Sequence, residues 1–228
     1  MSAVLYPDPD AAVAGIEDGS TVLISGFGMA GVPVELIDAL IRQGASDLTV
    51  VCNNAGNGDT GVAALLEQGR VRKVICSFPR QSDSWVFDRV YRAGQVELEL
   101  VPQGTLAERL RAAGAGIGGF YCPTGVGTPL ARDKETRVID GRTYVLEMPL
   151  KGDVALIRAR CADRMGNLVY RKTARNFGPI MATAASLTIA QVRRVVATGQ
   201  LDPEAVVTPG IYVDRVVLAG AADFEESA

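Results

Sequence analysis

The stretch DGSTVLISGFGMAGVP, Asp18 to Pro33, joins an apolar run to a glycine-rich turn and a proline. Residues Thr21 to Ser25 form an apolar segment bounded by turn residues, which is typical of a buried parallel β-strand. The turn from Gly26 to Gly31 has the pattern G-x-G-x-x-G, and a proline at position 33 favours the start of a helix. The stretch therefore predicts a strand, a close-fitting turn and a helix, the repeating unit of parallel sheets.

The same glycine pattern occurs in dinucleotide-binding folds, which also need an acidic residue at the end of the second strand, about 20 residues later. Here the segment DLTVVC ends in Cys52, Asn53 and Asn54, and Asp47 lies at its start, the wrong end of the sheet. A nicotinamide or flavin site is therefore not supported. Small residues before a helix still allow a ligand, and an anionic group in particular, to approach the backbone. The alternative is a tight turn that binds nothing.

Strand-like and helix-like segments alternate through the first part of the chain. Helical spacing follows Pro33 until Gly44 ends it, and Thr105 and Glu108 have the spacing of a capping box for a later helix. The further expected strands are 47–52, 72–77 and 96–101, and the further expected helices are 60–69, 82–94 and the one beginning at 105. This alternation predicts a parallel sheet with helices on both faces.

From about Lys134 the pattern changes. Asp140 and Gly141 separate two strand-like arms, a strong hairpin signal, and residues 165–167 join two more expected strands. A helix is expected over 177–187 and a strand or short helix over 189–199, and the tail 222–228 is expected to be frayed. With no linker or repeat, the sequence predicts one α/β domain, residues 1–228, with an open, mixed, mainly parallel sheet.

Composition narrows the class of protein. Hydrophobic residues make up 48% and charged residues 21%, as in folded globular proteins, and the net charge of −3 argues against a nucleic-acid partner. No apolar run approaches the roughly 20 residues of a membrane span, and the first ten residues do not resemble a secretory signal. The four cysteines include no CxxC pair, so we expect reduced thiols, no metal site and a cytoplasmic location.

The chain contains no histidine. This excludes Ser-His-Asp and Cys-His catalysis and the most common general base. If the chain is an enzyme, its reaction must need little proton transfer, or the reactive group must lie on another chain.

Three further stretches are informative: NNAGNG (Asn53 to Gly58), VPQGTLAERLRAAGAGIGGFYCPTGVGT (Val101 to Thr128) and YRKTARNFGP (Tyr170 to Pro179). With the opening stretch they resemble the alpha, or A-type, subunit of family I 3-oxoacid CoA-transferases, in order and over nearly the whole chain. The segment CSFPRQSDSWVFDRVYRAG (Cys76 to Gly94) is similar to the branch that acts on 3-oxoadipate in the β-ketoadipate pathway of aromatic hydrocarbon catabolism.

The resemblance implies an open α/β fold shared with several sugar-phosphate isomerases, and a ping-pong transfer of CoA from succinyl-CoA to a 3-oxo acid. A glutamate attacks the donor thioester, and a glutamyl–CoA thioester carries CoA to the acceptor carboxylate. In two-subunit members that glutamate lies in a Ser-Glu-Asn-Gly stretch of the beta, or B-type, subunit, and this chain lacks the stretch. The resemblance thus implies a heterodimer or A2B2 heterotetramer with a beta subunit, no permanently bound cofactor, and a CoA thioester as substrate.

The resemblance also assigns site residues. The CoA-binding segment is Ser25, Gly26, Phe27, Gly28, Met29, Ala30 and Gly31, and the substrate pocket is Asn53, Asn54 and Gln103. An Asx turn that closes a strand is the alternative for the asparagines. No catalytic nucleophile is assigned to this chain, since Glu35, Glu67 and Glu108 fall within expected helices.

Two departures and three alternatives accompany the resemblance. The family usually has two glycines where this chain has Ser25-Gly26, and its Ala-Glu-Gly-Lys-Glu stretch reads Ala131-Arg132-Asp133-Lys134-Glu135 here. The acceptor could instead be acetoacetate or a short-chain fatty acid. A non-catalytic ligand-sensing domain would need a DNA-binding helix pair, which is not visible, and a sugar-phosphate isomerase would need an acid/base constellation, which is also not visible.

Overall fold

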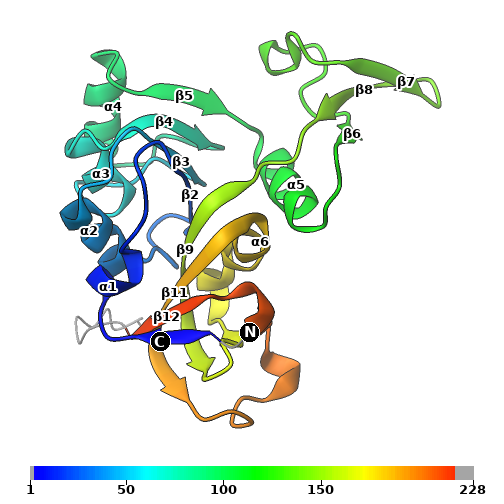
Figure 1. The fold of residues 1–228 in the computed structure, drawn as a ribbon. Helices are drawn as coiled ribbons and strands as arrows, with labels where there is room; N and C mark the ends of the chain where they lie inside the picture. The colour runs from blue at the N-terminus through cyan, green and yellow to red at the C-terminus, as the bar shows by residue number, and fades with distance from the viewer. Residues whose placement is uncertain (1–2, 219–228) are drawn as a thin grey trace.

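The computed structural model describes residues 3–218, so the expected frayed tail lies outside the described residues. A nine-stranded sheet forms the centre of the molecule (Figure 1). Its strands are β1 (Val4–Tyr6), β2 (Thr21–Ile24), β3 (Leu48–Cys52), β4 (Val71–Cys76), β5 (Glu97–Leu100), β9 (Gly152–Asp163), β10 (Leu168–Val169), β11 (Ala185–Val196) and β12 (Arg215–Leu218).

The strand order is β1-β12-β11-β9-β2-β3-β4-β5, and every neighbouring pair in this order is parallel. Only β10, which pairs with the far end of β9, runs antiparallel. The mixed, mainly parallel sheet is therefore confirmed. Its centre joins β2 to β9, two strands more than a hundred residues apart in the chain.

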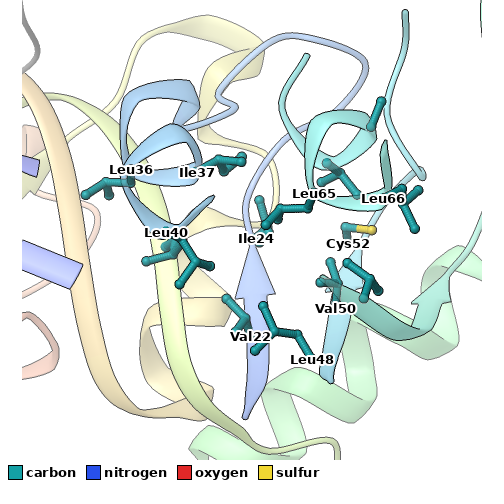
Figure 2. Packing of buried hydrophobic residues seen from close by; sticks show 14 of the residues in the cluster. Val22, Ile24, Leu36, Ile37, Leu40, Leu48, Val50, Cys52, Leu65 and Leu66 are labelled. Atoms are coloured by element: carbon teal, nitrogen blue, oxygen red, sulfur yellow. The ribbon is translucent and has the colours of Figure 1, made fainter. Parts of the chain in front are cut away.

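Helices cover both faces of this sheet, as predicted. Those on one face are α1 (Pro9–Val13), α2 (Val34–Gln43), α3 (Val62–Glu67) and α4 (Trp85–Arg92), and those on the other are α5 (Gln103–Gly114) and α6 (Gly178–Ala184). Alternate strand residues explain this arrangement, because Val22 and Ile24 pack under α2 and α3 whereas Leu23 packs under α6 (Figure 2). Among the described residues, no helix has the length and apolarity that crossing a membrane requires.

The start of α5 differs from the prediction. The helix begins at Gln103, and the Leu106 N–H donates to the Pro102 carbonyl at 2.8 Å, so Thr105 lies inside the first turn rather than at the cap. The Thr105 side chain is buried and its Oγ1 has no partner, while Glu108 pairs with Arg111. The capping-box prediction was wrong because the proline, not the threonine, fixes where the chain enters the helix.

The C-terminal third also needed correction. The predicted helix ends at Ala184, and Ala185 already pairs with Gly152, so 185–187 belong to β11. The segment expected as strand or short helix is the second half of this strand. The sequence did not predict β1, α1 or β12. Four short 3-10 turns complete the described elements: η1 (Pro129–Ala131), η2 (Lys172–Arg175), η3 (Pro203–Ala205) and η4 (Gly210–Tyr212).

The predicted hairpin forms, but in a separate sheet. Strands β6 (Phe120–Cys122), β7 (Thr136–Ile139) and β8 (Arg142–Glu147) pair antiparallel in the order β6-β8-β7 and project from the main body (Figure 1). Asp140 and Gly141 both have positive φ, as a two-residue hairpin turn requires. Every side chain of β7 is exposed, Val138 and Ile139 included, so this strand does not pack against the main sheet.

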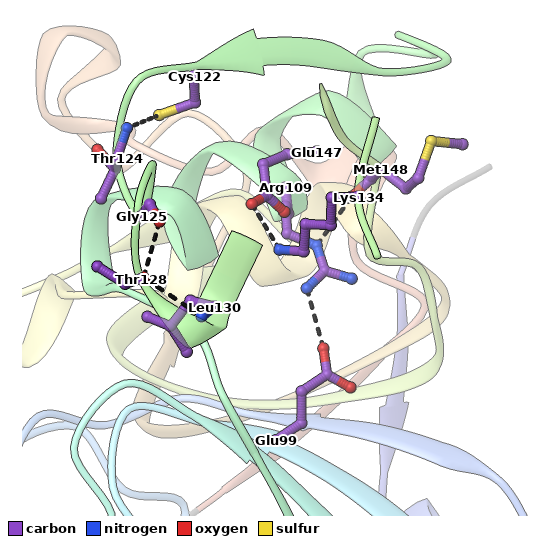
Figure 3. A network of polar contacts seen from close by, with 10 residues as sticks. All are labelled: Glu99, Arg109, Cys122, Thr124, Gly125, Thr128, Leu130, Lys134, Glu147 and Met148. Carbon is purple, nitrogen blue, oxygen red and sulfur yellow. Dashed lines mark hydrogen bonds and ion pairs between the residues drawn. The ribbon is translucent and has the colours of Figure 1, made fainter. Parts of the chain in front are cut away.

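Polar contacts attach the projecting sheet to the body. Arg109 on α5 donates through Nη1 to Glu99 Oε1 on β5 at 3.1 Å and through Nε to the Met148 carbonyl at 2.8 Å (Figure 3). Within the small unit, Lys134 Nζ pairs with Glu147 Oε1 at 2.7 Å, and the Glu147 side chain is buried. These contacts fix the path of the chain between α5, the small sheet and β9.

Candidate functional site

The glycine-rich loop follows β2 at the carboxyl edge of the sheet. The Ser25 side chain is buried, where its Oγ donates to the Gly31 carbonyl at 2.7 Å and accepts from the Arg158 N–H at 3.1 Å. Phe27 and Ala30 exchange backbone hydrogen bonds of 3.0 and 3.2 Å. Ser25 thus closes the loop on itself and ties it to β9, which explains why serine is accepted at this position.

Asn176 holds the same loop from the opposite end of the chain. Its Oδ1 accepts from the Gly26 N–H at 3.0 Å, and its Nδ2 donates to the Ala30 carbonyl at 2.9 Å. Neither composition nor spacing assigned a function to this residue. The only signal for it was its place in the YRKTARNFGP stretch.

Asn53 and Asn54 directly follow β3 beside this loop, and both are buried. The Asn53 Oδ1 accepts from Ser77 Oγ at 3.0 Å, and the Asn54 Oδ1 accepts from the Gly56 N–H at 3.1 Å. The second contact is the Asx turn that was the alternative interpretation. This turn uses only the Oδ1 atom of Asn54. Within the described residues, neither side-chain NH2 group donates a hydrogen bond to the protein.

A pocket lies between the two loops. Its lining combines the end of β2 and its loop, the end of β3 and its loop, and the start of α3; it includes Ile24, Ser25, Gly26, Gly28, Met29, Val32, Cys52, Asn53, Asn54, Gly56, Thr60, Gly61 and Val62. Its volume of about 10 Å³ is close to what one water molecule needs. A substrate must therefore lie mostly over this pocket, with only a small group inside it.

The structure brings together Ser25, Gly26, Gly28 and Met29 of the expected CoA segment with Asn53 and Asn54. Phe27, Ala30 and Gly31 belong to the same loop without lining the pocket. Gln103 stands apart from it, because it is exposed at the start of α5, after β5, and β5 lies two strands from β3. It shares the carboxyl edge with the asparagines but does not line their pocket.

The described lining of this pocket contains no carboxylate. Glu67 pairs with Arg89 and Glu108 pairs with Arg111, both on helix surfaces. Cys52 does line the pocket, but burial and the neighbouring Cys76 raise the pKa of its thiol well above the usual value, so it stays protonated. The described lining therefore offers amide donors and close backbone approach, and it presents neither a carboxylate nor an ionised thiol.

No group of three or more histidine, cysteine, aspartate or glutamate side chains that could hold a metal ion occurs within residues 3–218.

Comparison with known proteins shows the family to which the chain belongs. The profile of the family described as Coenzyme A transferase matches residues 6–219. The chain belongs to the coenzyme A transferase family. The resemblance seen in the four sequence stretches is thereby confirmed, and with it the enzyme class, a CoA-transferase in which this chain is the alpha subunit.

Two curated coenzyme A transferases are similar over nearly their whole length. The chain is 66% identical over 218 residues to the A-type subunit of 3-oxoadipate CoA-transferase from Pseudomonas putida, covering 95% of this chain and 94% of that protein. It is 50% identical over 223 residues to the A-type subunit of a probable succinyl-CoA:3-ketoacid coenzyme A transferase from Bacillus subtilis, covering 98% and 92%. Glutaconate coenzyme A-transferase from Acidaminococcus fermentans shares the fold, with a TM-score of 0.81 at 23% identity over 94% of this chain and 75% of that one.

Proposed function

We propose that this chain is the alpha subunit of a two-subunit enzyme that moves CoA from succinyl-CoA to 3-oxoadipate. The observation that carries the proposal is that the side-chain NH2 groups of Asn53 and Asn54 donate no hydrogen bond within the described residues. Both residues line one pocket with the glycine-rich loop, and the described lining of that pocket holds no carboxylate. The high identity to the corresponding subunit of a 3-oxoadipate CoA-transferase supports the choice of acceptor.

The chemistry suits a site without a general base. Exchange of carboxylates on a thioester uses carboxylates and a thiolate throughout, so the main requirement is stabilisation of transient oxyanions. The NH2 groups of Asn53 and Asn54 can donate to such an oxygen. The nucleophilic glutamate and its glutamyl–CoA thioester would lie on the beta subunit. The CoA thioester is then a substrate that comes and goes in a ping-pong cycle, and the protein holds no permanent cofactor.

Water must be excluded, because anhydrides and thioesters hydrolyse. The asparagine pocket is too small to enclose a substrate, so a second surface has to close over it. Large apolar side chains are exposed on the loops beside this pocket, namely Phe27, Met29, Phe78 and the first residue of α4, Trp85. The beta subunit, in a heterodimer or an A2B2 heterotetramer, would cover them and complete the site.

We also propose a cytoplasmic location. The four cysteines, Cys52, Cys76, Cys122 and Cys161, are all unpaired, which is the usual state of thiols in a reducing compartment.

The proposal is tested by purifying the chain alone and together with its beta subunit. Succinyl-CoA:3-oxoadipate exchange should require both chains, and peptide mass spectrometry should map a trapped glutamyl–CoA adduct to the beta subunit. Robust exchange by the single chain, or an adduct on one of its own residues, contradicts the half-site proposal. A higher kcat/KM for acetoacetate than for 3-oxoadipate contradicts the choice of acceptor.

Site variants sharpen this test. Asn54→Ala should lower kcat on the order of 10²-fold, the usual cost of one oxyanion donor. Asn57→Ala is the matched control, because Asn57 lies in the same loop, accepts from the Asp83 N–H and does not line the pocket. Equal losses in the two variants would indicate a loop defect rather than a lost donor. The Gln103→Ala variant tests whether this exposed residue acts in the assembled enzyme. If it does, the variant should form the glutamyl–CoA adduct more slowly, with the adduct on the same glutamate.

A further inference from the structure

A second pocket opens on the other side of the glycine-rich loop. Its walls include Arg158 and Arg160 of β9, Arg171 just before η2 and Arg193 of β11. Among the described residues that line it, none is acidic. Its volume is about 170 Å³, whereas a single water molecule needs only about 10–15 Å³. Size and charge therefore fit an anionic group of many atoms.

The sheet register places three of these arginines on one face. Gln191 of β11 lies opposite Arg158 of β9, and the period of two along each strand adds Arg160 and Arg193 to the same side. This is the face covered by α2, because the Gln191 Oε1 accepts from the Leu36 N–H near the start of that helix. Regular strand pairing thus places these three arginines, and Arg171 joins them from the segment before η2.

Basic charge is concentrated in this part of the chain. The 39 residues from 158 to 196 hold eight basic side chains and one acidic one, although the whole chain has a net charge of −3. The Arg160 side chain is exposed and makes no ion pair within the described residues. Such a local excess of positive charge attracts polyanions and is suited to phosphate, which arginine binds in a bidentate manner.

The arginine pocket is physically joined to the glycine-rich loop. The Arg158 N–H donates to Ser25 Oγ, and Ala174, another lining residue, packs against Gly31. In the order β3-β2-β9-β11, neighbouring strands lie about 4.8 Å apart, so the gap between β9 and β11 is about 12 Å from the end of β3. The loop after β2 lies between the two pockets.

We propose that the arginine pocket binds the phosphate groups at the nucleotide end of the CoA thioester. The pantetheine arm then lies across the Gly26–Gly31 loop, and the thioester reaches Asn53 and Asn54. Twelve bonds separate the diphosphate oxygen from the sulfur, about the length of four extended residues, or roughly 13–14 Å. This length matches the separation of the pockets. The inference rests on the proposed function, since it takes the CoA thioester as substrate.

The test compares three donors that carry the same acyl group on CoA, on dephospho-CoA and on pantetheine. With Arg160→Gln and Arg193→Gln in the assembled enzyme, we expect KM for the CoA donor to rise tenfold or more while kcat changes little. KM for the pantetheine donor should not change, because it has no phosphate. The dephospho-CoA donor lacks only the 3′-phosphate and keeps the diphosphate. Its KM therefore shows which of the two phosphate groups the arginines bind. Arg160→Lys should restore part of the effect, and Arg92→Gln on α4 is the control with an exposed arginine elsewhere.

Several outcomes overturn the inference. An equal rise in KM for all three donors means that the arginines act on the acyl end or on the fold, and an unchanged KM means that they do not bind the donor. If the arginine variants no longer co-purify with the beta subunit, the pocket takes an acidic surface of that chain instead. Calorimetric titration of the chain with CoA and with pantetheine needs neither partner nor activity. Binding of CoA that is insensitive to Arg160→Gln overturns the inference even if the proposed function fails.

Discussion

The carbonyl oxygen of Ala174 lies 2.5 Å from the point where a Cβ on Gly31 would stand. Gly31 also has a φ of +75°, and the Asn176 Nδ2 lies 2.7 Å from the same point. No side chain fits there without moving backbone of the segment that holds the loop. The glycine is therefore required by close packing between two distant parts of the chain as well as by its backbone conformation.

Gly31→Ala should consequently weaken both stability and donor binding, because Ala174 and Asn176 must shift and their contacts with the loop are lost. Gly28→Ala is the matched control: its φ is +60°, but the nearest atom to its Cβ position is the Gln81 Nε2 at 3.7 Å. We expect Gly28→Ala to cost about 1 kcal/mol of unfolding free energy, and Gly31→Ala clearly more. Urea unfolding of both variants checks the order, and equal costs would contradict the packing explanation.

Asn176→Ala should destabilise the chain by about 2 kcal/mol, since it removes contacts to Gly26 and Ala30 that are each worth about 1 kcal/mol. It should also lower kcat/KM of the assembled enzyme, because the glycine-rich loop loses its support. Asn176→Asp keeps the acceptor for the Gly26 N–H and should retain more activity than the alanine variant. Unfolding curves and steady-state kinetics measure the two effects, and an Asn176→Ala enzyme with normal kinetics would exclude a positioning role.

Asp133→Gly should stabilise the chain by up to about 1 kcal/mol. Asp133 has a φ of +63°, a conformation that costs a residue with a side chain about 1 kcal/mol or more. The position is also the one where the resembling family has glycine. Asp133→Ala is the opposing control, because alanine tolerates this conformation less well than aspartate. The thermal unfolding temperature should be highest for the Asp133→Gly variant, lower for the native chain and lowest for Asp133→Ala. Any other order would contradict the strain explanation.

Glu99 should contribute to loss of stability in acid. Partial burial raises its pKa, but hydrogen bonds from Lys73 and Arg109 outweigh burial, so its pKa in the folded chain lies below the usual value. A carboxylate with a depressed pKa stabilises the fold above its unfolded pKa of about 4.3, and this contribution disappears as the pH falls through the folded pKa. Because the side chain is about one-third exposed, we expect less than about 1 kcal/mol.

Glu99→Gln should therefore be less stable than the native chain at pH 7 and should lose less stability between pH 5 and pH 3. Glu97→Gln, a more exposed position on the same strand, is the control and should alter the profile little. Urea unfolding at several pH values decides the matter. A native-like acid slope in Glu99→Gln would show that this carboxylate is not coupled to folding.

The parts of the fold that were predictable are those fixed by local chemistry. Pro33 and Gly44 bound α2, and Asp140-Gly141 forms the hairpin turn, because the backbone angles of these residues leave few alternatives. The parts that were not predictable depend on distant partners. Nothing near Thr105 indicates that Pro102 starts the helix, and nothing in 134–147 indicates that the hairpin forms its own sheet.

The residues of the candidate site also include some whose positions were predictable from the sequence and some whose positions were not. Strand ends predicted that Asn53 and Asn54 would lie at the carboxyl edge beside the glycine-rich loop. They did not predict that Gln103 would stand apart, because its position depends on how far β5 lies from β3. The contacts of Asn176 with Gly26, 150 residues away, could not be read from periodicity either.

The central pairing of β2 with β9 has a consequence for biosynthesis. While the ribosome has delivered only the first half of the chain, β2 to β5 can pair among themselves, but the open side of β2 has no strand to bind until Gly152–Asp163 emerges. An unpaired parallel edge of this kind invites association between nascent chains, and contacts so distant in sequence form slowly. The glycine-rich loop cannot acquire its Arg158 and Asn176 contacts before that moment. Ligand-binding competence should therefore appear late, only after most of the polypeptide has left the exit tunnel.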